Sequence, residues 1–399
     1  MLFVLLPEEI MIYIITNFMT MKDLCILDIA ICEKKHRDIL LHIFTYSNVN
    51  FIGFPNQICL KHLSCLKWII NRKIKILNLC FGLLFQTDIF LPIIKGREKI
   101  FTTTCVNEIA DICPNLIYLS ILKCDWENSY IKIITNKCLH LEEINISCNI
   151  KLNIYSLIDL GNLKKLKTLT IYSCRKIFQN NVDIMLICNC FKSLKILNLC
   201  DIDVYNDDIF CLFFQSCKLE ILNMNHMRIS EAAIIRIVKC HCNIRSLSLN
   251  ACEGVNNDVL FLVSSYCKHL EVLEVDECNN ITDISIITIA KLCCRIKKIS
   301  VLDSIQITEI AILVVAEYSL DLEEIYYDNM TENVIMKLAE CSSKLQKLLI
   351  NITEHSEINL IHLLSNCPLL NLLKCDITIK ACYDLGYLNL CTFLEKQNL

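Results

Sequence analysis

Glycine and proline are scarce in this chain, which has 6 Gly and 5 Pro among 399 residues. So few breakers of regular structure leave little room for long flexible linkers or for a sandwich built on many tight turns. They also exclude glycine-rich phosphate loops, and the nine His form no motif with Cys, Ser or Asp that indicates a nucleophile and its base. The sequence therefore predicts a protein that is not an enzyme and needs no cofactor.

An excess of basic charge is also missing. The chain has 39 Lys and Arg against 43 Asp and Glu, which gives a formal net charge of -4. Proteins that bind nucleic acid usually present a dominant basic surface. Nucleic acid is therefore not expected as a partner.

Long apolar runs are absent although 54% of the residues are hydrophobic and the mean hydropathy is +0.46. A spanning helix needs about 18 apolar residues without interruption. Polar side chains break the most apolar stretch, residues 74–94, at Lys75, Asn78, Gln86 and Asp88. The apolar N-terminus lacks a basic flank, so we expect no signal peptide, no membrane contact and a cytoplasmic protein, with the nucleus as the alternative.

Cysteine, in contrast, is abundant, with 28 residues. In a long chain without a secretion signal, Cys that follow the apolar pattern are expected to be small buried hydrophobic residues in a reducing compartment. The pairs Cys188/Cys190 and Cys240/Cys242 lack the C-x-x-C spacing of structural zinc sites. No metal site is expected.

A repeat of the form L-x-x-L-x-L, with Ile, Val or Met in place of some Leu, dominates the chain. Its copies begin 23 to 28 residues apart, at Leu116, Leu141, Leu166, Leu194, Leu219, Ile244, Leu270, Ile296, Leu322, Leu345 and Leu370. The L-x-L core alternates with period two, which predicts a short strand with one buried face, and a segment with helical spacing follows it. Stacked units of this kind form a parallel sheet on the concave side with helices outside.

This pattern resembles the leucine-rich-repeat family over most of residues 66–380. Many Cys lie just before or just after the expected strand, as Cys138 and Cys148 do, which resembles the cysteine-containing subtype of that repeat. The resemblance implies an α/β leucine-rich-repeat solenoid, and it is familiar from substrate receptors of ubiquitin ligases. The units that begin at Ile296, Leu322 and Leu345 lack the Cys after the strand.

The N-terminal segment differs from the repeats. Pro7 suits a first helical position, and the two Glu that follow favour the positive end of a helix. One interpretation is a helical cap that closes the repeat stack. The other is an F-box, which L-P-x-E-I and a later D-L resemble. That resemblance implies docking onto the Skp-type adaptor of a cullin ubiquitin ligase through Leu6, Pro7, Ile10, Ile14, Leu24 and Leu27.

The residues that flank the buried L-x-L positions are expected to point out of the concave face of the sheet. In the later units they include an aromatic residue among charges, which is typical of a binding hot spot. We predict contacts with a protein target at Tyr172, Glu274, Asp276, Lys298, Glu324, Tyr326 and Asp328. The hypothesis is that the units from Leu270 to Tyr327 hold a basic or hydroxyl-rich segment, and the alternative is that the acidic residues only keep the sheet soluble.

The predicted organisation has an F-box-like segment at 1–50, a linker with a capping repeat at 51–110, repeats at 111–380 and a C-terminal cap or tail at 381–399. The predicted function is substrate recognition in an SCF-type ubiquitin ligase. The alternative is a leucine-rich-repeat scaffold or inhibitor outside any ligase, with residues 1–50 as a plain cap.

Overall fold

A computed structural model of the whole chain describes residues 78–82, 102–123, 126–178, 190–204, 207–214, 217–349, 355–370, 387 and 390. The F-box-like segment 1–50 and its six predicted adaptor contacts lie outside the described residues, as does most of the predicted C-terminal tail. The chain divides into two compact units, Met1–Ile196 and Leu197–Leu399.

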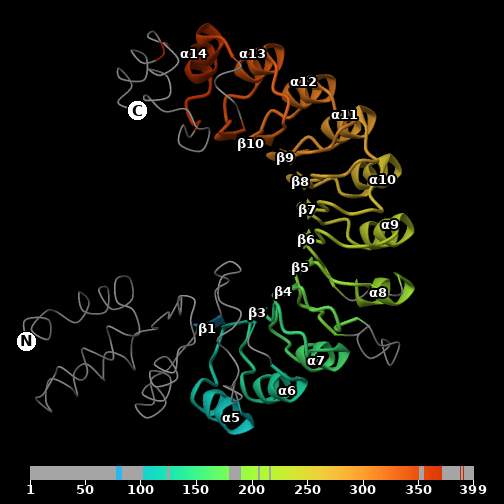
Figure 1. Cartoon of the computed structure of the whole chain (residues 1–399), viewed down its shortest axis with the longest axis vertical. Helices are drawn as coiled ribbons and strands as arrows, with labels where there is room; N and C mark the ends of the chain where they lie inside the picture. The colour runs from blue at the N-terminus through green and yellow to red at the C-terminus, as the bar shows by residue number, and fades with distance from the viewer. Residues whose placement is uncertain are drawn as a thin grey trace, which may run out of the picture. The chain divides into compact units, whose positions relative to one another are not determined.

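The first unit alternates parallel strands with helices (Figure 1). Strands β1 to β4 pair side by side in chain order. The elements are β1 (Asn78–Gly82), α5 (Thr103–Ile112), β2 (Tyr118–Leu122), α6 (Asn128–Lys137), β3 (Glu143–Asn145), α7 (Ile154–Leu160) and β4 (Thr168–Tyr172).

The second unit repeats the same alternation, and its strands β6 to β11 also pair in parallel and in chain order. Strand β5 (Ile196–Cys200) begins at the boundary between the units. The other elements are α8 (Asp207–Phe214), β6 (Ile221–Asn223), α9 (Glu231–Cys240), β7 (Ser246–Ser248), α10 (Asn257–Tyr266), β8 (Val272–Glu274), α11 (Asp283–Leu292), β9 (Lys298–Ser300), α12 (Glu309–Tyr318), β10 (Glu324–Tyr326), α13 (Glu332–Cys341), β11 (Lys347–Leu348) and α14 (Glu357–Asn366).

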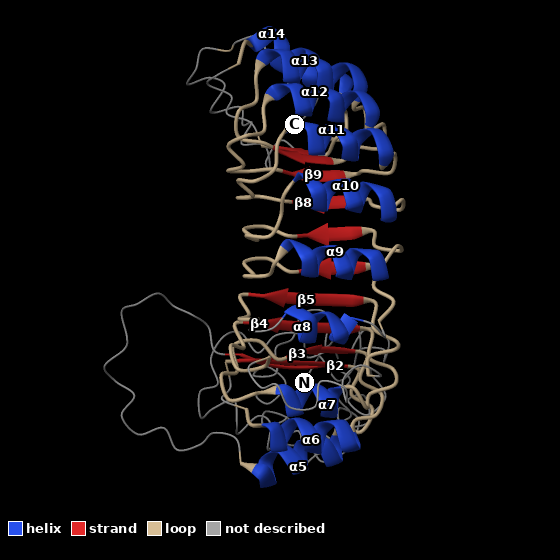
Figure 2. Ribbon diagram, turned by 90° about the vertical axis from the view of Figure 1, so that its right-hand side faces the viewer, coloured by secondary structure: helices blue, strands red, loops and turns tan. Residues whose placement is uncertain are grey.

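Within each unit the helices lie on one face of the sheet (Figure 2). No helix of the described residues covers the opposite face, which we call the open face. None of the described helices is long and apolar enough to cross a membrane. The predicted alternation of parallel strands and helices is therefore confirmed, and each unit is a stack of strand–helix repeats with one sheet surface that no described helix covers.

The apolar positions of the repeat form the core between sheet and helices. Leu270, Leu273 and Val275 are fully buried, and Ile286 and Ile289 of the following helix are buried against them. Burying such a side chain contributes about 1.5–3 kcal/mol relative to leaving it exposed. Because every repeat supplies the same positions, this burial sets the register of one strand against the next.

Cysteines complete this core at two positions of the repeat. At the helix end, the thiol of Cys138 donates to the carbonyl of Cys113 at 3.3 Å, and that of Cys367 donates to the carbonyl of Ser342 at 3.4 Å. After the strand, the thiol of Cys252 donates to the carbonyl of Met224 at 2.9 Å. Burial raises the pKa of Cys138 and of Cys252 to about 12, so both remain protonated thiols.

The prediction of buried Cys is wrong at three positions. Cys240, Cys242 and Cys294 are exposed. His241 lies at the buried helix-end position between the first two, and Cys293 occupies that position beside the third. One residue per repeat fits this position, so its sequence neighbours point to solvent.

The turn after the strand adopts a left-handed backbone without glycine. The cost for a side chain there is about 1–2 kcal/mol. Most of these turns gain a hydrogen bond to the next repeat, as when the N–H of Ala251 donates to the carbonyl of Asp276 at 2.8 Å. The residues at this position have φ between 50° and 57°: Lys123, Cys148, Ser173, Asp201, His226, Ala251, Glu277 and Asp303.

Candidate protein-binding face

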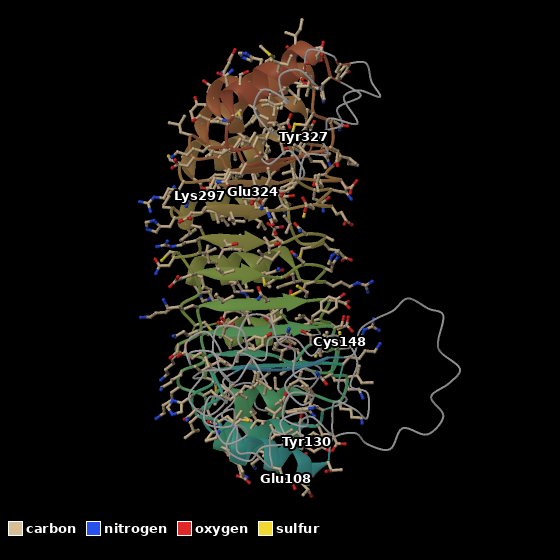
Figure 3. All side chains as sticks on the ribbon, turned by 90° about the vertical axis from the view of Figure 1, so that its left-hand side faces the viewer. Glu108, Tyr130, Cys148, Lys297, Glu324 and Tyr327 are labelled. Atoms are coloured by element: carbon tan, nitrogen blue, oxygen red, sulfur yellow. The ribbon has the colours of Figure 1, made fainter. Side chains whose placement is uncertain are left out.

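The open face of the second unit presents columns of side chains, because parallel strands in register stack equivalent residues (Figure 3). Lys298 pairs in register with Glu324, and Glu324 with Lys347. Two residues along, on the same face, Glu274 pairs with Ser300 and Ser300 with Tyr326. The structure thus brings Glu274, Lys298, Glu324 and Tyr326 of the predicted target contacts onto one surface.

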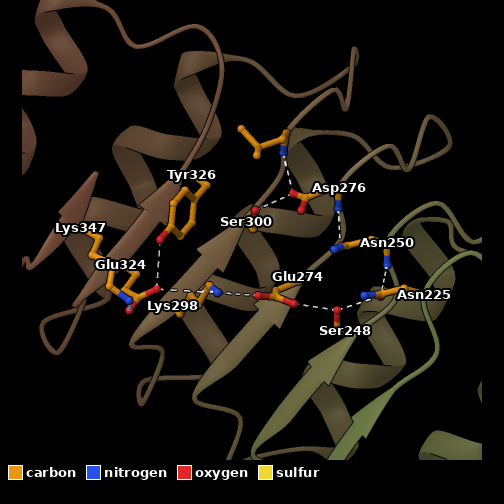
Figure 4. Close-up of polar contacts among 11 residues, drawn as sticks. Asn225, Ser248, Asn250, Glu274, Asp276, Lys298, Ser300, Glu324, Tyr326 and Lys347 are labelled. Carbon is orange, nitrogen blue, oxygen red and sulfur yellow. Dashed lines mark hydrogen bonds and ion pairs between the residues drawn. The ribbon is translucent and has the colours of Figure 1, made fainter. Parts of the chain in front are cut away.

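The charges on this surface form a chain of ion pairs (Figure 4). The Nζ atom of Lys298 lies 2.6 Å from Oε1 of Glu274 and 3.7 Å from Oε2 of Glu324. Lys347 pairs with the other oxygen of Glu324. The two Glu and two Lys alternate, so their charges cancel along the row.

The surroundings keep these groups charged. Burial by itself lowers the pKa of Lys298, but the carboxylates of Glu274 and Glu324 outweigh it, and the pKa is raised overall. Burial by itself raises the pKa of Glu324, but the ammonium groups of Lys347 and Lys298 outweigh it, and the pKa is lowered overall. The row is therefore ionised and internally neutral near pH 7.

Tyr326 is the aromatic residue of this row. Its hydroxyl donates to Oε2 of Glu324 at 3.2 Å, and the Nζ atom of Lys298 lies 5.3 Å from its ring centroid. A cation over a ring face at this distance is attractive. The ring is half-buried, and these two contacts hold it in one orientation. Such a ring suits an anchor for a partner, because it loses little side-chain entropy on binding.

A second row follows the ends of the strands and consists of side-chain oxygens that accept from the next repeat. Oδ1 of Asn225 accepts from the backbone N–H of Asn250, and Oδ1 of Asn250 accepts from that of Asp276, at 2.8 and 2.9 Å. Oδ1 of Asp276 accepts from Ser300 Oγ at 2.5 Å and from the N–H of Leu302 at 2.8 Å. The carboxylate of Asp276 therefore joins two repeats.

Two other predicted target contacts lie apart from this row. Asp328 is exposed, and its Oδ2 accepts from the backbone N–H of Asp303 at 2.5 Å. Tyr172, at the end of β4, belongs to the first unit and is 45% exposed. Sequence reasoning missed Lys347, which binds Glu324, and Ser248, which binds Glu274. Each lies in register with its Glu on the neighbouring strand, and this position in the repeat is the sequence signal that identifies it.

These contacts change the predicted chemistry of the face. Glu274 and Glu324 are neutralised by Lys298 and Lys347, and Asp276 is bound to the scaffold. The open face around β8 to β11 is therefore a mixed polar surface with an aromatic centre and not a free acidic surface.

Two substitutions at Asp276 distinguish the effect of its negative charge from its role as a hydrogen-bond acceptor. Burial raises the pKa of Asp276, which means that the charged form is disfavoured there. In Asp276→Asn the amide oxygen keeps accepting, as Asn250 does, so we expect the wild-type free energy of unfolding in urea or a slightly larger one. Asp276→Ala leaves the N–H of Leu302 without this acceptor and should cost about 1–2 kcal/mol. Equal losses in both variants would contradict this role.

No family model matches the sequence, and no curated protein is similar to it in sequence. Yeast Rad7, solved in a complex with Elc1, is similar in structure at 16% identity, with 89% of this chain and 92% of that chain covered and a TM-score of 0.56. The chain shares this fold, which is that of a leucine-rich-repeat stack.

Two bacterial structures match with lower scores. An internalin, InlF of Listeria monocytogenes, has 15% identity, a TM-score of 0.44, and coverage of 84% of this chain and 81% of its own. The leucine-rich-repeat protein LegL7 of Legionella pneumophila has 14% identity, a TM-score of 0.43, and coverage of 67% and 96%.

Proposed function

We propose that this leucine-rich-repeat protein is the target-recognition subunit of a cullin-type ubiquitin ligase. The repeats hold a target protein on the open face, and residues 1–50 dock onto a Skp-type adaptor. The observation that carries the proposal is the order of the chain, in which an F-box-like L-P-x-E-I leader precedes a regular repeat stack. The chain performs no chemistry itself, and its contribution is to hold the target near the transfer machinery.

The open face supports the recognition half of this proposal. It is a sheet surface that no described helix covers, and it carries Tyr326 fixed by Glu324 and Lys298. Tyrosine is enriched at the centres of protein interfaces, where one aromatic anchor contributes much of the binding energy. The paired charges around it give a rim that selects a partner by complementarity more than by net attraction.

The sequence of the leader supports the adaptor half. The F-box resemblance places the contacts at Leu6, Pro7, Ile10, Ile14, Leu24 and Leu27. The resemblance of the Cys positions to the cysteine-containing repeat subtype of ligase receptors points the same way. Rad7, which shares the fold, was solved together with a second protein, Elc1, and this supports a repeat protein that carries a partner.

A pull-down with purified Skp-type adaptor tests the proposal. We expect the wild-type chain to retain the adaptor and the triple variant Leu6→Ala, Pro7→Ala, Ile10→Ala to lose it. The matched control is a triple variant at exposed leucines of the repeats, Leu139→Ala, Leu320→Ala, Leu369→Ala, which should bind like wild type. Circular dichroism verifies that all three proteins are folded.

The alternative is an interaction scaffold outside any ligase. In that case residues 1–50 only cap the repeat stack, and Leu6, Pro7 and Ile10 are buried. Folded wild-type protein that does not bind the adaptor contradicts the ligase proposal and leaves this scaffold.

A further inference from the structure

The strand ends and the helix starts of the second unit lie along one edge, on the side to which the strand arrows point (left in Figure 2). Four turn segments between β7 and α13 form this surface, which we call the acidic edge: residues 249–259, 275–285, 301–311 and 327–334. These segments contain no Lys or Arg. They carry nine carboxylates, at Glu253, Asp258, Asp276, Glu277, Asp283, Asp303, Glu309, Asp328 and Glu332.

Among the described residues, the hydrogen bonds to these carboxylates come mainly from neutral donors. Asp283 accepts from the N–H and the hydroxyl of Thr308, at 2.7 and 2.6 Å, and Glu309 accepts from the hydroxyl of Thr331 at 2.5 Å. These donors are neutral. Arg228, in the preceding turn, lies 3.8 Å from Glu253, and both side chains are largely exposed. The carboxylates order the edge without losing their charge.

The helix dipole explains part of this charge. Asp258, Asp283, Glu309 and Glu332 lie in the first turns of helices, where negative side chains are stabilised. Glu277, Asp303 and Asp328 lie in the loops before the helices and are exposed, so the dipole does not account for them.

Exposed isoleucines lie among these carboxylates. Ile284, Ile305 and Ile310 are 63%, 80% and 58% exposed. Ile284 and Ile310 are the second residues of the packed helices α11 and α12, whose starts the bonds from Thr308 to Asp283 join. The side chain of Gln306 donates to the carbonyl of Asn279 at 2.5 Å, which joins the turn that carries Ile305 to the turn of the preceding repeat. These three aliphatic side chains are exposed on neighbouring segments of the acidic edge and have no role in the core.

The opposite edge, where the strands begin and the helices end, carries both signs of charge. Lys297 lies 3.1 Å from Glu271 there, and Lys344 lies 2.5 Å from Asp321. A run of carboxylates without Lys or Arg is therefore a feature of the acidic edge and not of the opposite edge of the same repeats.

We propose that the acidic edge, with Ile284, Ile305 and Ile310 among its residues, binds a Lys- and Arg-rich segment of a partner protein that also carries aliphatic side chains. Charge complementarity selects this occupant, because the edge attracts basic side chains. It repels the phosphates of nucleic acid and of anionic membranes. The aliphatic side chains of the segment cover the three isoleucines and remove them from water. This inference does not depend on residues 1–50.

The probe is a synthetic peptide of about 18 residues with Leu at helical spacing and Lys elsewhere. Two comparison peptides replace every Leu by Ser or every Lys by Glu. Affinity for the full chain is measured by fluorescence anisotropy at about 50 mM and about 500 mM salt. We expect the Lys/Leu peptide to bind about tenfold or more tightly than either comparison peptide, and to weaken at high salt.

Two variants with the same change of charge locate the site. Asp258→Asn, Glu277→Gln, Asp303→Asn neutralises exposed carboxylates of the acidic edge, whereas Glu108→Gln, Glu317→Gln, Glu340→Gln neutralises exposed carboxylates elsewhere. The edge variant should bind the Lys/Leu peptide about tenfold more weakly, and the control should stay within about twofold of wild type.

A third variant, Ile305→Ser, Ile310→Ser, should lose the preference for the Lys/Leu over the Lys/Ser peptide. Equal weakening in the edge variant and its charge control would overturn the proposal, and so would absence of binding by the wild-type chain. Failure of the adaptor pull-down would leave this site intact, because the peptide experiment uses no adaptor.

Discussion

His241→Cys should remove a large part of the acid sensitivity of the second unit. His241 follows α9 at the position that Cys138, Cys267 and Cys367 occupy in other repeats. Its side chain is 3% exposed, and its ring packs edge-on against Phe214 with 5.9 Å between the centroids. A titratable ring thus occupies a position that elsewhere holds a small thiol.

The folded state resists protonation of this ring. Burial lowers the pKa of His241 to about 4, and the carbonyl of Phe214 offsets the burial only in part. Neither ring nitrogen makes a hydrogen bond of normal geometry to the described residues. The unfolded chain binds a proton at its ordinary pKa near 6.5 and the folded chain does not until about pH 4. Stability is therefore unaffected above about pH 6.5 and falls as the pH is lowered from there to about 4.

The size of this loss follows from the shift and is about 3 kcal/mol when complete. It is measured as the free energy of unfolding in urea at several pH values, for wild type and His241→Cys. Because both chains share every carboxylate, the difference between them isolates the histidine. As the pH is lowered from about 7 to about 4, we expect the free energy of unfolding of the variant to rise by about 3 kcal/mol relative to that of wild type.

The exposed His269→Cys makes the same chemical exchange outside the core and is the control for the substitution itself. A constant difference between wild type and His241→Cys across this range would contradict a buried neutral histidine.

The fold could be predicted from the sequence because the core is periodic. The copies that begin at Leu219, Ile244 and Leu270 place Leu222, Leu247 and Leu273 in neighbouring buried positions, and the strands pair in that register. The spacing alone determines this result, since a slip by one residue would expose the whole apolar set.

The candidate site was less accessible to sequence reasoning. Glu274, Lys298 and Tyr326 were predicted as surface residues, and the structure places them together on the open face. Whether an acidic side chain forms an ion pair or a hydrogen bond depends on the residues of the neighbouring repeat, about 25 residues away, and on side-chain conformation. Lys347 neutralises Glu324 in this way, and Asp276 bonds to Leu302. Asn225 and Asn250 occupy the same position in the two preceding repeats and also accept from a backbone N–H of the next repeat. This correspondence is the sequence signal that Asp276 acts as an acceptor.

Gly254 was not singled out by its sequence context, yet it marks a close approach of two turns. A Cβ atom at Gly254 would lie 2.6 Å from the backbone N of Glu231 and 2.7 Å from the carbonyl carbon of Ser230, and it would also overlap the carbonyl oxygen of Ile229. These are backbone atoms at the start of α9, where Ser230 caps the helix. They cannot yield as the end of a flexible side chain can.

Gly254→Ala should therefore cost about 3 kcal/mol of the free energy of unfolding, the upper part of the range for overpacking. The neighbouring Glu253→Ala is the control, because it removes an exposed side chain and one exposed ion pair and should cost less than about 1 kcal/mol. Urea unfolding measures both, and hydrogen exchange at residues 229–231 locates the effect. A Gly254→Ala chain with the wild-type midpoint would contradict the close approach.

The same substitution reaches the acidic edge. Residues 249–259 rest backbone to backbone on the turn at Ile229 to Glu231, so a displaced Gly254 moves Glu253 and Asp258 relative to the repeats on either side. We expect the remaining folded Gly254→Ala protein to bind the Lys/Leu peptide more weakly, although its charge is unchanged. Because the net charge is the same, such a loss would show that the edge recognises its partner through the arrangement of carboxylates and not through total charge alone.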